Sequence, residues 1–190
     1  MTIRCLDTVA TMDSLFDQLK IDFRLHMNGV ASQSMREKGS EWKYNWGVSL
    51  PELTRMAQQY EPDKAQAADL WSRHVRECKI IATMLMPPNE LSIDEAEQWM
   101  NDITTQELAE IAAMHLFSRV PYAEQLVARW TTNAEPYHQI CAYNIASRLL
   151  MKGQSQDETW LESLRDNATR ALNSEHSGVR HAAYNCLNRL

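Results

Sequence analysis

Apolar positions recur every three or four residues along this chain, and this spacing predicts helices almost from end to end. In residues 7–27, six apolar side chains form one such stripe: Val9, Met12, Leu15, Phe16, Leu19 and Phe23. Turns rich in Gly, Pro, Ser and Thr separate the helices that follow. We place these at residues 31–38, 50–60, 62–71, 75–86, 93–100, 105–119, 121–131, 136–150, 156–172 and 178–190. No run shows the period-two alternation of a strand, so a sheet is not expected.

Several predicted helix starts carry Ser or Thr with Glu three residues later, which is the capping-box pattern. These pairs are Ser49–Glu52, Ser92–Glu95, Thr104–Glu107, Thr132–Glu135 and Ser155–Glu158. Pro62, Pro121 and Pro136 stand where a first helical residue would be. The connections between helices are short, so neighbouring helices are expected to pack antiparallel.

One helical motif occurs twice in the second half of the chain. Residues 142–149 (AYNIASRL) return 41 positions later as residues 183–190 (AYNCLNRL), with five of eight positions identical. Helical units of about 40 residues are typical of HEAT and armadillo repeats. We therefore expect an all-α fold, an α-solenoid of HEAT-like antiparallel helix pairs; the alternative is an irregular helical bundle. The length of 190 residues predicts one domain, 1–190, with capping helices in 1–40.

The formal net charge of −6 comes from the middle of the chain. Residues 1–60 hold 7 acids and 7 bases, residues 61–119 hold 11 and 5, and residues 120–190 hold 7 and 7. This balance counts against tight nonspecific binding of nucleic acid unless cations gather on one face.

Six cations fall on the second helices of the predicted pairs, the row that lines the inside of a solenoid. They are Arg76, Lys79, Arg148, Lys152, Arg180 and Arg189. We expect them to form a basic groove that contacts phosphates. The alternative is that they cap helix ends or pair with Glu77, Glu135 and Glu175.

Four cysteines without a CxxC motif indicate reduced thiols in a cytoplasmic protein: Cys5, Cys78, Cys141 and Cys186. No signal peptide and no apolar run near 20 residues is present, so no membrane contact is expected. His74 with Cys78 and His138 with Cys141 lie one helical turn apart. Neither pair completes a set of four ligands, so no metal or other cofactor is expected.

The six tryptophans fall into two groups. Four stand in predicted helices at positions expected in the core: Trp71, Trp99, Trp130 and Trp160. Trp42 and Trp46 lie with Tyr44 in a loop and are candidates for ligand contact. The alternative is that these loop aromatics close over the first helix pair.

Several short runs identify a known family by resemblance. They are Asn45-Trp46-Gly47-Val48, Leu50-Pro51-Glu52-Leu53, Leu70-Trp71 and Arg76-Glu77-Cys78-Lys79, followed by a helix that ends in Leu85. Through these runs the chain resembles the bacterial DNA alkylation repair glycosylases of the AlkD type, which are built of HEAT-like repeats. The resemblance covers about residues 30–190.

The resemblance implies removal of cationic N3- and N7-alkylated purines from duplex DNA, without flipping the base into a pocket. In that family a carboxylate stabilises the oxocarbenium-like sugar, and tryptophan faces add cation–π stabilisation. The family's aspartate falls on Glu110, which is the expected catalytic residue. Gln106 occupies the first tryptophan position, and the second falls on Asn185 or, with a one-residue slip, on Tyr184. Tyr184 and Trp46 join the expected DNA contacts.

Three functions remain open from the sequence. The first is a DNA glycosylase that acts on alkylated purines. The second is a DNA-binding relative that recognises distorted duplex without excising a base. The third is a helical scaffold that binds a protein partner.

Overall fold

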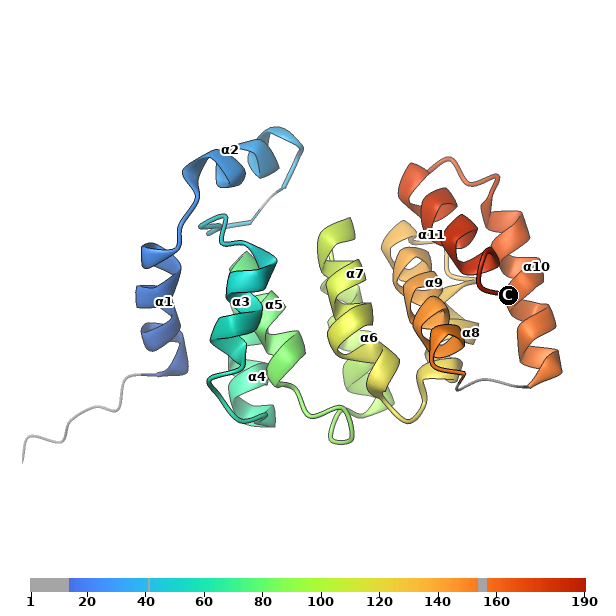
Figure 1. The fold of residues 1–190 in the computed structure, drawn as a ribbon, viewed down its shortest axis with the longest axis horizontal. Helices are drawn as coiled ribbons and strands as arrows, with labels where there is room; N and C mark the ends of the chain where they lie inside the picture. The colour runs from blue at the N-terminus through green and yellow to red at the C-terminus, as the bar shows by residue number, and fades with distance from the viewer. Residues whose placement is uncertain (1–13, 41, 154–156) are drawn as a thin grey trace, which may run out of the picture.

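The computed structural model describes residues 14–40, 42–153 and 157–190, and these ranges are helical (Figure 1). The helices are α1 (Leu15–Leu25), α2 (Gly29–Glu37), α3 (Leu50–Ala57), α4 (Lys64–Ser72), α5 (Arg76–Leu85), α6 (Ile93–Asn101), α7 (Gln106–His115), η1 (Phe117–Arg119, a 3-10 helix), α8 (Ala123–Trp130), α9 (Pro136–Met151), α10 (Glu158–Ala171) and α11 (Ser177–Leu187). The all-α prediction is confirmed. Residues 7–13 of the first predicted helix lie outside the described ranges.

One predicted capping box forms as expected, at Ser92. Its Oγ accepts the N–H of Glu95, and the Glu95 carboxylate accepts the Ser92 N–H at 2.8 Å. Three other predictions were wrong or shifted: Ser49 makes no side-chain cap, and the cap of α7 is Thr105 rather than Thr104. The N-cap of α9 is Glu135 itself, without a side-chain cap bond. Ser155 lies outside the described residues.

Two predicted helix starts and one helix end need correction. Pro136 begins α9 as expected, whereas Pro62 and Pro121 precede α4 and α8 by two residues. The helix predicted over 105–119 ends at His115, and the chain turns at Leu116 into η1. Leu116 and Phe117 are fully buried at this turn.

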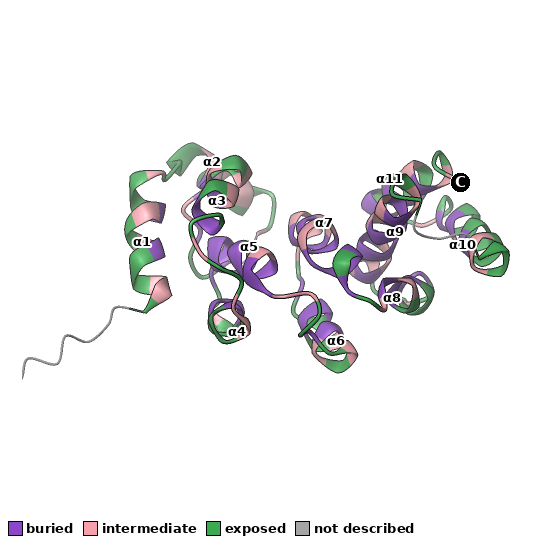
Figure 2. Cartoon of the chain, turned by 60° about the horizontal axis from the view of Figure 1, so that its bottom comes forward, coloured by how far each residue is buried: buried purple, intermediate pink, exposed green. Residues whose placement is uncertain are grey.

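The helices form two rows. Figure 2 shows α4, α6, α8 and α10 on the outside of the curve and α5, α7, α9 and α11 on the inside. We call these the outer row and the inner row. Helix α3 lies against the inner side of α5, and α1 and α2 extend the N-terminal end (Figure 1).

The repeat is shorter than the sequence motif suggested. Inner-row helices α5, α7 and α9 begin 30 residues apart, and only α11 follows at a spacing of 41. Side-chain hydrogen bonds repeat this period because they link equivalent places in adjacent pairs. Five of them join residues 31 apart: Trp46–Glu77, Lys64–Glu95, Trp71–Asp102, Arg76–Glu107 and Leu91–Tyr122. The predicted period of about 40 therefore describes the last step alone, in which α9 and α10 are longer.

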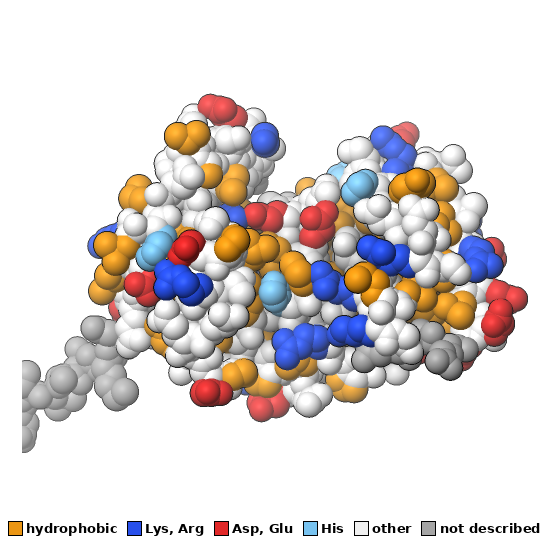
Figure 3. All heavy atoms as spheres, viewed as in Figure 1, with side chains coloured by type: hydrophobic (Ala, Val, Ile, Leu, Met, Phe, Trp, Pro, Cys, Tyr) orange, Lys and Arg blue, Asp and Glu red, His pale blue; other side chains and the backbone are white. Residues whose placement is uncertain are grey.

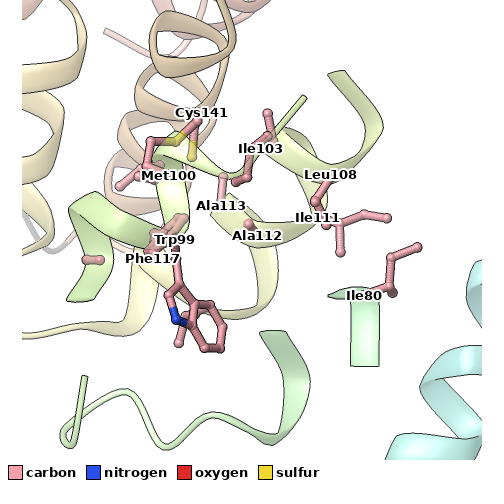
Figure 4. Close-up of a cluster of buried hydrophobic side chains, with 14 of the residues drawn as sticks. Ile80, Trp99, Met100, Ile103, Leu108, Ile111, Ala112, Ala113, Phe117 and Cys141 are labelled. Atoms are coloured by element: carbon pink, nitrogen blue, oxygen red, sulfur yellow. The ribbon is translucent and has the colours of Figure 1, made fainter. Parts of the chain in front are cut away.

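The core runs continuously between repeats. Figure 4 shows Ile80 of α5, Trp99 and Met100 of α6, Ile111 of α7 and Cys141 of α9 in one cluster. Because each pair buries its apolar face only against the next pair, the stack is the unit of stability.

The tryptophans of the outer row lie in this core. The rings of Trp71 and Trp99 stack at 4.2 Å, and Trp130 donates to the Glu97 carboxylate at 2.8 Å. The core prediction is right for these three, whereas Trp160 is half-buried.

The cysteines that the structure describes are buried and free: Cys78, Cys141 and Cys186. Cys5 lies outside the described residues. In the same ranges, no helix combines the length and the hydrophobicity that crossing a bilayer requires.

Candidate nucleic-acid interface

Helix α7 presents one half-buried strip on the inner side of the stack, and Glu110 lies in it. Thr105 caps this helix by accepting the N–H of Leu108, and Gln106 then stands one turn before Glu110. The amide Nε2 of Gln106 donates to Glu110 Oε1 at 2.7 Å. Glu110 therefore carries its charge on the inner row beside a neutral partner.

The position of Gln106 depends on α11. A Cβ atom on Gly178 would lie 2.4 Å from Gln106 Oε1, so the glycine leaves room for this amide. Helix α11 thus contributes to the placement of the Gln106–Glu110 pair, although it lies far away in the sequence.

Two of the expected phosphate contacts are buried instead. Arg76 is 2% exposed: its guanidinium donates to both oxygens of Glu107, at 2.6 and 2.8 Å, and to the carbonyl of Val48 at 3.0 Å. Lys79 is 5% exposed, with Nζ 4.2 Å from the Trp71 ring centroid and 3.4 Å from Asp102. Because α3 and α4 pack on α5, nine of its ten residues are buried. The expectation that Arg76 and Lys79 line the groove is thus wrong.

Other cations gather at the C-terminal ends of the inner-row helices. We call this group the basic cluster: His115, Arg119, Arg148, Lys152 and Arg189. Figure 3 views the molecule from the inner row, and Lys and Arg side chains gather there below the hollowed upper edge. Within residues 14–40, 42–153 and 157–190, none of these five side chains forms an ion pair with a carboxylate.

The members of the basic cluster affect one another electrostatically. Burial lowers the pKa of His115, and the positive charges of Arg148 and Arg119 lower it further. Burial and then Arg189 lower the pKa of Arg148 in the same way. The His115 Nε2 atom is buried without a hydrogen-bond partner among the described residues. The arginines and lysine of the basic cluster, which have no carboxylate partner in the described ranges, are suited to bind an anion.

The acids lie mainly on the other row. Helices α9 and α11 contain no Asp or Glu, and on the inner row Glu77 and Glu107 are bonded to Arg76. The outer row holds eight acids: Asp69, Asp94, Glu95, Glu97, Glu124, Glu158, Glu162 and Asp166. The acidic total of the chain therefore hides a separation of charge between its two rows.

The remaining predicted contacts have mixed surroundings. Arg180 is exposed and caps the turn before α11 through the carbonyls of Ser174 and Glu175. Tyr184 is 57% exposed on α11. Trp46 is half-buried, with its ring 5.4 Å from that of Phe23, so it packs on the capping helix α1 rather than over the first helix pair.

Arg119 and His115 were missed from the sequence because both stood inside one long predicted helix. A signal was present for Arg148 and Arg189, which occupy the same place in the two copies of the repeated motif. Equivalent arginines on adjacent helices must form a column.

Comparison with known proteins gives a consistent result. A model of the family described as "DNA alkylation repair enzyme" matches residues 19–190. No curated protein sequence matches the chain. A similar solved structure is described as "A new family of proteins related to the HEAT-like repeat DNA glycosylases with affinity for branched DNA structures". It has a TM-score of 0.79 and 14% identity, and the match covers 92% of this chain and 74% of that one. This likeness supports the HEAT-like solenoid, and the family match over 19–190 shows that the chain belongs to the DNA alkylation repair enzyme family.

Proposed function

We propose that the protein binds duplex DNA along its inner row, with the basic cluster on the phosphates. The observation that carries this proposal is the clustering itself: Arg119, Arg148 and Arg189 form no ion pair with a carboxylate among the described residues. Arg148 and Arg119 both act on His115, and Arg189 acts on Arg148. A fold gains nothing from such an arrangement, whereas a polyanion compensates all of these charges at once. Membership of a DNA repair family supports the same choice of ligand.

The direct test compares two arginines, one beside the inner row and one on the outer row. Arg148→Gln removes a charge from the basic cluster, and Arg129→Gln removes one from the outer row, where Arg129 pairs with Glu97 at 3.4 Å. Fluorescence anisotropy with a labelled duplex at low salt should show several-fold weaker binding for Arg148→Gln and unchanged binding for Arg129→Gln. Equal effects of the two variants would contradict the proposal. No binding at low salt would favour the protein-scaffold hypothesis.

Base excision is a second candidate function, and Glu110 supports it. Its half-buried carboxylate lies on the DNA-binding side and is bonded to an amide rather than to a cation. An uncompensated carboxylate attracts a cationic alkylated purine and stabilises an oxocarbenium-like sugar as the glycosidic bond breaks. The tryptophan walls of the family are replaced by Gln106 and by Asn185 or Tyr184, so any rate depends on Glu110.

Release of free 7-methylguanine from an alkylated duplex measures this second function. Glu110→Gln should abolish the release while duplex affinity stays the same or rises. Release that is unchanged in Glu110→Gln would remove this residue from the mechanism. No release by the wild type, combined with retained binding, would leave DNA binding without excision as the function.

The setting of this activity is proposed to be the cytoplasm, in base excision repair. Three buried thiols that remain free support a reducing compartment. The structurally similar protein is described as having affinity for branched DNA, so a four-way junction belongs beside the plain duplex in the binding assay.

A further inference from the structure

A hollow of about 480 Å³ lies between α2 and the N-terminal ends of α7 and α9. Met35, Lys38 and Trp42 line it from α2 and the following loop, and Gln106, Glu107 and Tyr137 line it from α7 and α9. Figure 3 shows the surface hollowed at this place, between the lobe of α2 and the lobe of α11. Its volume falls within the roughly 300–1,000 Å³ of small-ligand sites. The proposed phosphate contacts do not use it.

We propose that this hollow takes up an unpaired nucleobase of bound DNA. The inference rests on the proposed DNA binding and deepens it by naming the kind of DNA: duplex with an extrahelical base. Two aromatic side chains line the hollow: Trp42, which is buried and forms part of its wall, and Tyr137, whose half-buried ring is partly open to it. Every nucleobase offers a face that stacks on a ring such as that of Tyr137.

The polar groups of the hollow suit the edge of a base. The Glu107 carboxylate is fixed from behind by the buried Arg76, at 2.6 and 2.8 Å, yet its side chain is 40% exposed. Each of its oxygens keeps a lone pair for an N–H donor of a base. The Thr105 hydroxyl accepts the N–H of Leu108 and can still donate its own proton. These acceptors and donors are set by contacts within the protein, so they are in place before a ligand arrives.

The hollow also lies at a suitable distance from the basic cluster. Gln106 and His115 begin and end α7, nine residues apart, which corresponds to roughly 13 Å along the helix. This length is close to the ~12 Å width of the DNA major groove. A duplex with a phosphate on the basic cluster therefore brings its neighbouring bases within reach of the hollow.

The test uses three duplexes of the same length: fully paired, with one bulged 2-aminopurine, and with one bulged abasic site. The abasic bulge has the same flexible backbone but no base, so it separates uptake of a base from recognition of a bend. The wild type should bind the 2-aminopurine bulge at least about fivefold more tightly than either of the others. The fluorescence of 2-aminopurine should change on binding.

Variants at Tyr137 locate the effect. Tyr137→Leu should remove the preference for the bulged base without changing the affinity for paired duplex, and Tyr137→Phe should retain the preference because it keeps the ring. Arg148→Gln should weaken binding to all three duplexes by the same factor. Circular dichroism confirms that each variant is folded.

Two results would overturn the inference while DNA binding stands. One is equal affinity for the abasic and the 2-aminopurine bulge, and the other is a preference that survives Tyr137→Leu. If none of the three duplexes binds, the proposed function fails, and the inference fails with it.

Discussion

Arg148 shows at the residue scale how the inner row differs from an ordinary protein surface. It is half-buried, its pKa is lowered by burial and by Arg189, and no carboxylate in the described ranges pairs with it. A cation in this position weakens the fold, because desolvation and repulsion both act against its charge. Residues that reduce stability and make no stabilising contact in exchange are often functional.

We therefore predict that Arg148→Gln leaves the stability of the protein unchanged or raises it while DNA binding is weakened. Its free energy of unfolding should remain within about 0.5 kcal/mol of the wild type or exceed it, measured by urea denaturation. A loss above about 1 kcal/mol would show that Arg148 stabilises the fold and would weaken its functional assignment.

His115 leads to a prediction about pH. Burial, then Arg148 and Arg119, lower its pKa below the usual 6.5, so the folded protein binds this proton less readily than the unfolded chain. The contribution of His115 to stability is complete above pH 6.5 and is lost as the pH falls below that value. A phosphate beside the ring favours the protonated form, so DNA affinity should increase as the pH decreases from about 7.5 to 6.

His115→Gln should remove this part of the pH dependence of DNA affinity, measured by anisotropy at constant ionic strength. Burial also lowers the pKa of His138, which lies beside Trp130 in the core. The His115→Gln variant still contains His138, so its stability should still decrease at acid pH. DNA affinity is therefore a more informative measurement than stability. An identical pH profile for wild type and His115→Gln would contradict the role of His115.

At the scale of elements, the loop before α3 is fixed to α5 by a buried carboxylate. Oε1 of Glu77 accepts the backbone N–H groups of Trp46, Gly47 and Val48 at 3.1, 3.0 and 3.3 Å, and Arg76 also donates to it. This contact holds α3 over the inner side of α5 and excludes solvent from Arg76. The motif that carries the family resemblance is thus structural at these positions.

Gly47 is the residue in this loop that tolerates the least change. Its φ is +70°, and an added Cβ would meet two backbone atoms, the Asn28 carbonyl oxygen at 2.3 Å and the Ser32 nitrogen at 2.8 Å. Gly153 is a matched control, since its φ is +63° and no described atom lies within 4 Å of an added Cβ. Gly153→Ala should cost roughly 1–2 kcal/mol from backbone strain alone. Gly47→Ala should cost clearly more in the same thermal unfolding measurement, and an equal loss would refute the described packing.

The sequence predicts most helices of this fold, but it predicts few of the contacts that each helix makes with its neighbours. The spacing of apolar residues located the helices, because this pattern is local, whereas Pro62 and Pro121 precede the helix starts by two residues. The repeat length was wrong because it came from one motif in α9 and α11, the longest step of the stack. Arg76 and Arg148 look alike in the sequence, since each lies on an inner-row helix. The difference between them is whether α3 covers the helix, and no local pattern contains that information.

At the scale of the whole molecule, the two rows of the stack carry opposite charge character. The outer-row helices α4, α6, α8 and α10 contain eight acidic residues, whereas the inner-row helices α9 and α11 contain none. The net charge of −6 therefore does not predict the partner, whereas its distribution favours DNA on the inner side. The Glu110 carboxylate and the hollow beside Tyr137 lie on this same side.

The salt dependence of duplex binding tests this account most directly. Each phosphate neutralised by the protein contributes about 0.9 to the slope of log affinity against log salt. We predict that the combined variant Arg119→Gln, Arg148→Gln and Arg189→Gln lowers the magnitude of this slope by roughly 2 to 3 relative to the wild type. An unchanged slope would mean that DNA does not contact the basic cluster and would contradict the account.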